Sequence, residues 1–376
     1  MGEGGATAAR PGRLGVIGSG PSDVDGGQVP SGRGRAAPAT IRDVAERAGV
    51  STATVSRVLA GIGNPNPRTA ATVRAAARDL AFRPSGVARS LRTRRTRTLG
   101  LIVTDIQNPF FPELVQAADM AARAVGYSIL LGSAAYDEHR AMHYLDLMVD
   151  SRVDGMIIAS SQLSHESWSR LATSPVPVVV VNAEPAGVPV TVITSDNAEG
   201  ARMAAAHLIA LGHRRIAYIR GHEGFTADGP RIEGFRAACL EAGIPRADIV
   251  EVRGDGQVEG GERAASELLS AGSRVTAVAC YNDMTAIGAM RAIRQAGLRV
   301  PADISIIGCD DIAAASWVVP ALTTVAQQKA EMGRTAVERI TAALDHPDRL
   351  AVQETIRMPM TLVLRESTGP PPAPGA

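Results

Sequence analysis

Two short helical patterns separated by only a few residues limit what the start of this chain can form. The first begins at Thr40, where Thr40 and Asp43 have the spacing of a capping box, and it ends at Gly49. The second begins after Ser51, an N-cap residue, and runs to about Leu59. Because the turn between them is so short, the two helices must cross steeply. The pattern therefore predicts a helix-turn-helix.

A third helical pattern follows Asn66 and Pro67, an N-cap residue with proline at the first helical position. Its apolar positions, which include Val73 and Leu80, recur with helical spacing. Helices this short are marginal alone. We therefore expect the three to pack into one small all-α domain over residues 40–83.

Charge is divided unevenly along the chain, although the whole sequence has a net charge of only +1. Twelve arginines and three acidic residues lie between Thr40 and Arg97, a net charge of +9, whereas residues 98–376 carry −9. A basic module on an acidic body is typical of a polyanion-binding head joined to a sensor or an enzyme. Lys329 is the only lysine, and we attribute the bias toward arginine to GC-rich codons.

The second helix of such a motif enters the major groove of DNA. We expect Val55 and Val58 to pack on the first helix and the opposite face to contact bases. Arg57 is the best candidate for a base contact, because its fork can hold guanine O6 and N7 together. A three-helix bundle with a merely solvated charged face is the alternative. The predicted DNA-binding residues of the head are Thr40, Ser51, Thr52, Ala53, Thr54, Ser56 and Arg57.

From Thr98 onward, short apolar strands alternate with helices, the signature of a parallel sheet flanked by helices. The predicted strands are 99–103, 127–131, 155–158, 176–181, 215–219, 277–280 and 305–308. The predicted helices are 112–125, 141–150, 198–210, 231–242, 262–269 and 284–295. Because about 270 residues of this pattern exceed one comfortable sheet, we predict two lobes with a cleft between them.

Several classes of protein are disfavoured by what the chain lacks. Gly- and Pro-rich composition predicts disorder in residues 1–39 and 366–376. No apolar run approaches the roughly 20 residues of a membrane helix, and no secretory signal opens the chain, so we predict a cytoplasmic protein without membrane contact. The cysteines lack metal or disulfide spacing and should be small buried hydrophobes: Cys239, Cys280 and Cys309.

Enzyme signatures are likewise missing. There is no Walker lysine, no nucleophile elbow and no paired His and Cys, and the pair His139 and His143 has no third metal ligand. The adjacent Asp310 and Asp311 suit ligand binding better than acid–base work. We therefore predict no enzyme, no catalytic residue, no metal and no cofactor.

The segment TIRDVAERAGVSTATVSRVL, residues 40–59, resembles the DNA-binding head of the LacI/GalR family of bacterial repressors. The resemblance continues through RPSGVARSLRTRRTRTLGLIV and covers residues 40 to about 365. It implies a hinge over 84–97 and an effector-binding domain of periplasmic-binding-protein-like fold over 98–365. The implied lobes are about 98–196 with 327–355, and about 197–326 with 356–365.

The resemblance also assigns a role to the hinge. In the family, two hinges fold into short helices in the minor groove at the centre of the operator, and a leucine from each wedges into a base step. Leu91 occupies the matching position, accompanied by Ser85, Ala88 and Arg89. Residues 87–91 are too few for a helix alone, so they should order only where DNA and a partner hinge supply contacts. An ordinary charged linker is the alternative.

Family positions in the cleft identify the effector residues. Asn282 and Asp310 also follow predicted strands, and strand C-termini are where open α/β sheets bind ligands. Together with Arg231 they could offer directional hydrogen bonds to the hydroxyls of a sugar or nucleoside. The predicted effector-binding residues are Phe110, Phe111, Ser160, Arg231, Asn282, Asp310 and Gln327.

Two departures from the family concern the same cleft. The family usually has tyrosine where Cys309 stands, which we interpret as a repacked strand rather than an enlarged pocket. Residues 254–256 carry no aromatic side chain where several relatives have one, so we expect no stacking platform on that side.

These observations predict an all-α helix-turn-helix head followed by a two-lobed α/β domain with parallel sheets. We expect a transcriptional repressor that binds a palindromic double-stranded operator as a homodimer, under control of a carbohydrate or nucleoside effector. A dimer rather than a tetramer follows from the absence of C-terminal leucine heptads. The alternatives are a transporter solute-binding protein, which would need an export signal and no head, and a regulator whose body binds a protein effector.

Overall fold

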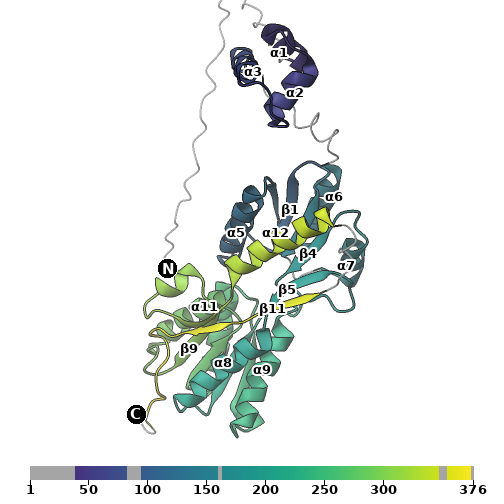
Figure 1. Cartoon of the computed structure of the whole chain (residues 1–376). Helices are drawn as coiled ribbons and strands as arrows, with labels where there is room; N and C mark the ends of the chain where they lie inside the picture. The colour runs from purple at the N-terminus through teal and green to yellow at the C-terminus, as the bar shows by residue number, and fades with distance from the viewer. Residues whose placement is uncertain (1–38, 83–94, 160–162, 347–353, 374–376) are drawn as a thin grey trace, which may run out of the picture. The chain divides into compact units, whose positions relative to one another are not determined.

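The computed structural model describes residues 39–82, 95–159, 163–346 and 354–373. The chain divides into two compact units, Met1–Pro84 and Ser85–Ala376 (Figure 1). The hinge predictions for Ser85, Ala88, Arg89 and Leu91, the effector prediction for Ser160 and residues 1–38 of the N-terminal tail lie outside the described residues. None of the helices in the described ranges combines the length and apolar character needed to span a bilayer.

The head consists of three helices, α1 (Ile41–Ala48), α2 (Thr52–Ala60) and α3 (Pro67–Asp79). The predicted capping box is present, since the Thr40 hydroxyl accepts from the backbone N–H of Asp43 and the Asp43 carboxylate accepts from the backbone N–H of Thr40. Gly49 and Gly61 end α1 and α2 at φ values of 64° and 65°, which glycine adopts without a steric penalty. The three helices bury one small core of Val44, Ala45, Val55, Val58, Ala70, Val73, Ala76 and Ala77.

The first lobe of the body is built on a parallel six-stranded sheet in the order β11-β5-β4-β3-β1-β2. Its strands are β1 (Thr98–Val103), β2 (Ser128–Ser133), β3 (Gly155–Ala159), β4 (Val178–Val181), β5 (Thr191–Ser195) and β11 (Thr355–Met358). Its helices are α5 (Phe110–Ala124), α6 (Glu138–Asp150), α7 (His165–Ala172) and α12 (Lys329–Asp345).

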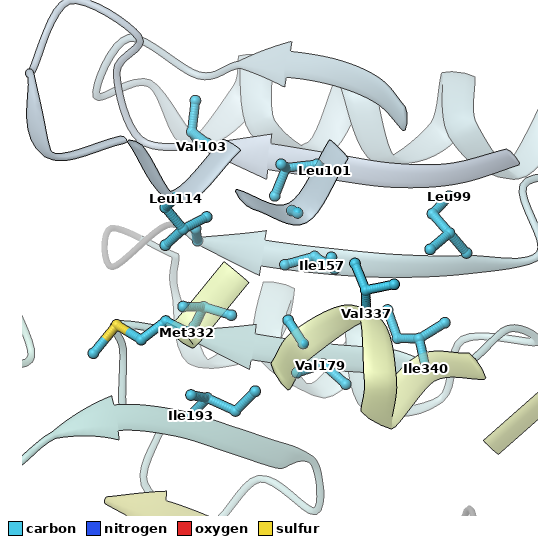
Figure 2. Close-up of a cluster of buried hydrophobic side chains, with 14 of the residues drawn as sticks. Leu99, Leu101, Val103, Leu114, Ile157, Val179, Ile193, Met332, Val337 and Ile340 are labelled. Atoms are coloured by element: carbon cyan, nitrogen blue, oxygen red, sulfur yellow. The ribbon is translucent and has the colours of Figure 1, made fainter. Parts of the chain in front are cut away.

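Apolar side chains of α5 and α12 cover one face of this sheet. Figure 2 shows Leu99, Leu101 and Ile157 of the strands beside Val337 and Ile340 of α12. The two helices lie close together, because a Cβ atom added at Gly333 would stand 2.3 Å from the carbonyl oxygen of Leu114. The other face of the sheet packs against α6 and α7 through a second cluster that includes Met148 and Trp168.

The second lobe repeats the plan with the order β12-β10-β9-β8-β6-β7, in which only β12 runs antiparallel to its neighbour among the described strands. Its strands are β6 (Ile216–Arg220), β7 (Ile249–Arg253), β8 (Ala277–Cys280), β9 (Ser305–Asp310), β10 (Thr323–Ala326) and β12 (Thr361–Val363). Its helices are α8 (Asn197–Ala210), α9 (Asp228–Glu241), α10 (Val258–Ser270) and α11 (Asp283–Gln295). Short 3-10 turns occur at Arg246–Asp248 and Ala313–Ser316.

The predicted fold class is confirmed, and every strand and helix predicted from the sequence is present, most of them with ends shifted by a few residues. The three cysteines are buried, as predicted. Some short strands were missed, because segments such as TVITS at Thr191–Ser195 show too few apolar positions to display a period. The missed strands are β5, β7, β10, β11 and β12, and the helices α7 and α12 were missed as well.

The structure shifts two predicted boundaries in the C-terminal region. The last crossing between lobes follows Met358 instead of residue 355, because β11 continues the first sheet by pairing with β5 through Met358. Residues 366–373 are not a disordered tail. Ser367 is fully buried, and its hydroxyl donates to the carbonyl oxygen of Ile306 at 2.6 Å. Backbone pairing with β9 therefore outweighs the Pro- and Gly-rich composition of this segment.

His213 anchors the same C-terminal segment and makes the second lobe sensitive to acid. Its side chain is fully buried, with Nδ1 2.8 Å from the Thr276 hydroxyl and Nε2 2.9 Å from the Gly369 carbonyl oxygen. Burial lowers the pKa of His213 below its ordinary value of 6.5, although the Gly369 contact opposes this shift. The stability that neutral His213 contributes is therefore present above about pH 6.5 and is lost as the pH falls through the lowered pKa.

We accordingly expect the melting temperature to fall between pH 7.5 and pH 5, and to fall less in a His213→Gln variant. Calorimetric scans at a series of pH values measure this. His139→Gln is the matched control, since that histidine is exposed on α6. Equal pH dependence in the native chain and the His213→Gln variant would contradict the assignment.

Candidate functional site

The exposed face of α2 carries the residues predicted to read DNA. Thr52, Ala53 and Arg57 are exposed, and Val55 and Val58 are buried against α1 and α3 as expected. The Arg57 guanidinium makes only a long contact, 3.4 Å from Nε to the carbonyl oxygen of Ala53. The face therefore presents a methyl group, a hydroxyl and a guanidinium, each of which can contact a base edge.

Two of the other predicted contact residues of the head, Thr40 and Ser51, use their hydroxyls to cap helices. Ser51 caps α2, with its Oγ 3.0 Å from the Thr54 hydroxyl and 3.2 Å from the Thr54 amide nitrogen. The Thr40 hydroxyl and amide both contact Asp43, and these hydrogen bonds lower the pKa of that carboxyl. Ser56 is half-buried. Thr40 and Ser51 therefore hold the N-termini of α1 and α2, whose free N–H groups favour phosphate.

Exposed arginines surround these helices. The six in the described part of the head all have exposed side chains, and one of them, Arg47, lies 3.7 Å from Asp79: Arg42, Arg47, Arg57, Arg68, Arg74 and Arg78. A small core with this much exposed positive charge suits a polyanionic partner.

In the body, the carboxyl ends of strands from both lobes meet at one narrow cavity. Residues that the sequence placed at strand ends and helix starts come together there. The lining includes all six predicted effector residues of the described chain: Phe110, Phe111, Arg231, Asn282, Asp310 and Gln327. It also includes residues that sequence reasoning missed: Thr104, Asn108, Tyr136, Ala159, Asn182, Phe225, Gly256 and Tyr281.

Arg231 is the most heavily engaged side chain of this cavity and is only 3 % exposed. Nε donates to Asn197 Oδ1 at 2.8 Å, Nη1 donates to the Tyr281 carbonyl oxygen at 2.5 Å, and the guanidinium carbon lies 4.6 Å from the Tyr281 ring centroid. Nη2 stands 3.8 Å from Asp310 Oδ1. These contacts fix the guanidinium at the cavity wall, so a solvated arginine on a helix surface is ruled out.

Asp310 is also held by Gln327. Gln327 Nε2 donates to Asp310 Oδ1 at 2.6 Å, and Gln327 Oε1 accepts from the Ser195 hydroxyl at 2.7 Å. Burial raises the pKa of the Asp310 carboxyl, and the charge of Arg231 and the Gln327 hydrogen bond oppose that rise. Ser195 and Gln327 stand on two crossings between the lobes, so the acid is tied to the segments that join them.

Asn282 is committed to structure more than the sequence suggested. It is the N-cap of α11, with Oδ1 accepting from the amide and hydroxyl of Thr285 at 2.9 and 2.8 Å. Its Nδ2 donates to the carbonyl oxygen of Gly256 at 2.9 Å. Asn282 therefore shapes the cavity wall and keeps little capacity to bind anything else.

Aromatic side chains concentrate at the cavity. Five of the twelve aromatic residues of the chain line it: Phe110, Phe111, Tyr136, Phe225 and Tyr281. Phe225 and Tyr281 stack with ring centroids 5.4 Å apart. The expectation of no stacking platform beside Gly256 is wrong, because a Cβ at Gly256 would stand 2.8 Å from Phe225 Cε2 and its absence makes room for that ring.

The first lobe contributes two features to the cavity: a buried hydrogen-bond acceptor without a partner, and a tyrosine at the entrance. Among the described residues, Asn182 Oδ1 is one of two buried side-chain polar atoms without a hydrogen-bond partner. Such an atom costs free energy unless another group bonds to it. At the mouth, Gln257 Nε2 donates to the Tyr136 hydroxyl and joins the two lobes. The free volume inside is about 40 Å³, little more than one water molecule, so a larger molecule would enter only when the lobes separate.

Comparison with known proteins covers both units. The model of bacterial regulatory proteins of the lacI family matches residues 40–85, and that of the periplasmic-binding-protein-like domain matches residues 205–368. The transcriptional repressor PurR of Erwinia tasmaniensis is 39 % identical over 324 residues, which is 85 % of this chain and 95 % of the relative. The chain belongs to the LacI family.

Solved structures of the LacI family agree. The Lac repressor dimer bound to operator and the anti-inducer ONPF has a TM-score of 0.80 at 29 % identity, over 89 % of this chain and 100 % of that one. A LacI-family regulator from Enterococcus faecium with bound ribose has a TM-score of 0.66 at 31 % identity, over 73 % and 99 %. This LacI-family chain is a DNA-binding transcriptional regulator, and its head decides against the transporter alternative.

Proposed function

We propose that this regulator is a cytoplasmic repressor that binds a palindromic operator as a homodimer and releases or tightens its hold when a sugar or nucleoside occupies the cleft. The observation that carries the ligand class is the cavity between the lobes. The guanidinium of Arg231 and the carboxylate of Asp310 line this cavity together with aromatic rings, which combines directional hydrogen bonds with a flat apolar surface. Sugars and nucleosides offer both a ring face and several hydroxyls.

The unpartnered Asn182 Oδ1 supports the same ligand class. A hydroxyl is the group that supplies a hydrogen to such an acceptor and takes one in return from a donor such as Arg231. Asn182 follows β4 in the first lobe and Arg231 belongs to α9 in the second. A ligand that contacts both would hold the lobes together, which is the kind of differential contact a switch requires.

A thermal-stability screen tests the ligand class. Each of a panel of pentoses, hexoses, disaccharides and nucleosides is added to the full chain, and the melting temperature is recorded. A ligand at about 100 times its Kd stabilises the folded form by roughly 2.7 kcal/mol. If no member of the panel shifts the transition, the cleft does not bind this class, and a protein effector becomes the better hypothesis.

Homodimer formation is supported by an apolar patch on the second lobe. Val319 and Trp317 are 85 % and 75 % exposed, the highest fractions among the large hydrophobic side chains of the described residues. Val319 lines a groove of about 460 Å³ in which apolar residues such as Ile287 and Pro320 alternate with three arginines: Arg291, Arg294 and Arg299. An apolar surface of this kind marks an interaction site. A second copy is the occupant we propose, because one helix-turn-helix reads only a half-site.

The proposal assigns base reading to Arg57. Replacing Arg57 by alanine should relax the preference at one base position of each half-site by roughly 1–3 kcal/mol, because a bidentate contact to guanine is lost. Duplexes selected from a random pool, then titrated with every base at each position, measure this preference. Arg42→Ala on α1 is the control, and it should weaken all duplexes equally. An unchanged base preference in the Arg57→Ala variant would remove Arg57 from the reading surface.

The hinge completes the proposal on the basis of the family resemblance alone. Leu91 is assigned as the wedge at the operator centre, with Ser85, Ala88 and Arg89 beside it. The coupling between effector and operator would run through the hinge, because its folding requires a partner hinge at the right separation. By linkage, a ligand that weakens operator binding must itself bind less tightly to the DNA-bound dimer.

A further inference from the structure

Lys329 is the single lysine of this protein. The chain contains 39 lysine and arginine residues, and 38 of them are arginines. Lys329 is also only 3 % exposed, at the first position of α12, where the chain has just crossed from the second lobe to the first. GC-rich codons account for the arginines, but they do not account for a single lysine kept at a buried site.

The position is costly for a cation. A buried ammonium loses its hydration, and the N-terminus of a helix carries the positive end of the helix dipole. Three acceptors offset this cost. Nζ lies 2.6 Å from the carbonyl oxygen of Asp310, 2.9 Å from that of Asp311 and 3.3 Å from Glu113 Oε2. An ammonium has three N–H donors in a compact head, whereas the planar guanidinium of arginine cannot converge on three acceptors around one point.

Two of these acceptors belong to a strained turn. Asp310 and Asp311 have φ values of 117° and 54°, a region that residues with a side chain rarely adopt and that neighbouring structure must enforce. Lys329 binds the carbonyl oxygens of both. The turn sends the Asp310 carboxylate into the cavity and the Asp311 carboxylate to Arg365, with Arg365 Nη2 2.6 Å from Asp311 Oδ1.

The third acceptor belongs to the opposite wall of the cavity. Glu113 lies in the first turn of α5, the same turn that carries the cavity residues Phe110 and Phe111. Its carboxylate is about half exposed, with 52 % of the side chain accessible, whereas 4 % of the Lys329 side chain is accessible. One ammonium therefore touches the Asp310 wall of the second lobe and the phenylalanine wall of the first.

We propose that Lys329 is a positioning residue that braces the two walls of the cleft and links the Asp310 turn to α5. The role as a positioning residue for a ligand rests on the proposed function of the cleft, whereas the brace itself exists without a ligand. Of the three contacts of the Lys329 ammonium, the ion pair with Glu113 is the one that can break, because Glu113 is exposed to solvent. A ligand that moves either wall changes the distance between Lys329 Nζ and Glu113 Oε2. Occupancy of the cavity is thereby coupled to the position of α5.

Because Lys329 is the only lysine, the reactivity of its amine can be measured directly and used to test the brace. Reductive methylation with ¹³C-formaldehyde labels amines, and NMR separates the Lys329 signal from that of the terminal amine. Arg334→Lys supplies a reference, because Arg334 lies on the same helix with 52 % of its side chain accessible. We expect Lys329 to react at least tenfold more slowly than the introduced lysine. Equal rates would overturn the proposal.

Glu113→Gln tests the ion pair between Lys329 and Glu113, which joins the two walls of the cleft. The substitution is on an exposed side chain and leaves the buried core unchanged. We expect it to raise the reaction rate of Lys329 several-fold at an unchanged melting temperature. Glu331→Gln, which removes a carboxylate of the same helical turn that pairs with Arg334, is the matched control and should leave the rate alone. A rate unaffected by Glu113→Gln would overturn the link between the walls.

Lys329→Met and Lys329→Arg test positioning separately from stability, with D-ribose and adenosine as probes. We expect both variants to bind a probe at least tenfold more weakly per folded molecule, and arginine not to rescue. A purely structural lysine would lower the melting temperature and leave that affinity unchanged. If neither probe binds the native chain, D-ribose and adenosine are excluded as effectors, while the amine reaction rates still decide whether the brace exists.

Discussion

Replacing Asp310 by asparagine should cut effector affinity by about 10- to 100-fold while leaving operator binding without effector intact. The variant keeps the shape of the side chain and removes the charge that faces Arg231 across 3.8 Å. A hydrogen bond to a charged group contributes about 1.5–3 kcal/mol, which corresponds to that loss. Titration calorimetry with the ligand found by the thermal screen measures the affinity, and a gel shift measures operator binding.

Asp311→Asn is the matched control for this experiment. Asp311 is the next residue on the same turn, but its carboxylate pairs with Arg365 and does not line the cavity. Affinity should therefore change less than about threefold. If the two variants lose the same affinity, the effect comes from the turn and not from a contact between Asp310 and the ligand. If Asp310→Asn binds as tightly as the native chain, Asp310 is not a ligand contact.

The cavity shows how far the reasoning from sequence could reach. All six described residues expected at the effector site line one cavity, because the family resemblance placed them and the parallel sheets bring strand ends together. The same rule applied more widely identifies further lining residues. Thr104 follows the predicted strand 99–103, and Asn182 follows 176–181 directly. Those two needed no structural information and were missed only because polar residues at other strand ends were singled out.

Other features could not be read from local pattern. Phe225 lies in a loop without periodicity, and its place beside Tyr281 depends on the missing side chain of Gly256, a contact across 31 positions of sequence. Ser367 sits in a segment whose composition predicts disorder, yet it is buried by pairing with β9. In both cases tertiary contacts decide the structure, and composition or spacing within a short window does not contain them.

The single lysine shows a second reason why some features could not be predicted from the sequence. The bias toward arginine, which we attributed to GC-rich codons, hides the exception at Lys329. Its three acceptors come from Glu113, Asp310 and Asp311, which lie as much as 216 positions away in sequence. Only the packed structure shows that an arginine head group would not fit among them.

Replacing Val319 by aspartate should separate the dimer and lower operator affinity by about 100-fold or more. Val319 is the most exposed large hydrophobic side chain among the described residues, and a charge there would be desolvated in an interface formed by two copies. When two half-sites are read by linked heads, the second contact is intramolecular and contributes roughly 10²–10⁴ in affinity, which separate monomers lose. Sedimentation velocity measures the mass of the particle, and titration of the selected operator measures the affinity.

Leu240→Asp is the control that makes the result specific. Leu240 is 50 % exposed on α9 and does not line the groove beside Val319. The same chemical change there should leave both mass and operator affinity unchanged. Since each monomer of the Val319→Asp variant keeps its own cleft, ligand binding should persist when operator affinity is lost. A Val319→Asp chain that still sediments as a dimer would show that the two copies meet through another surface.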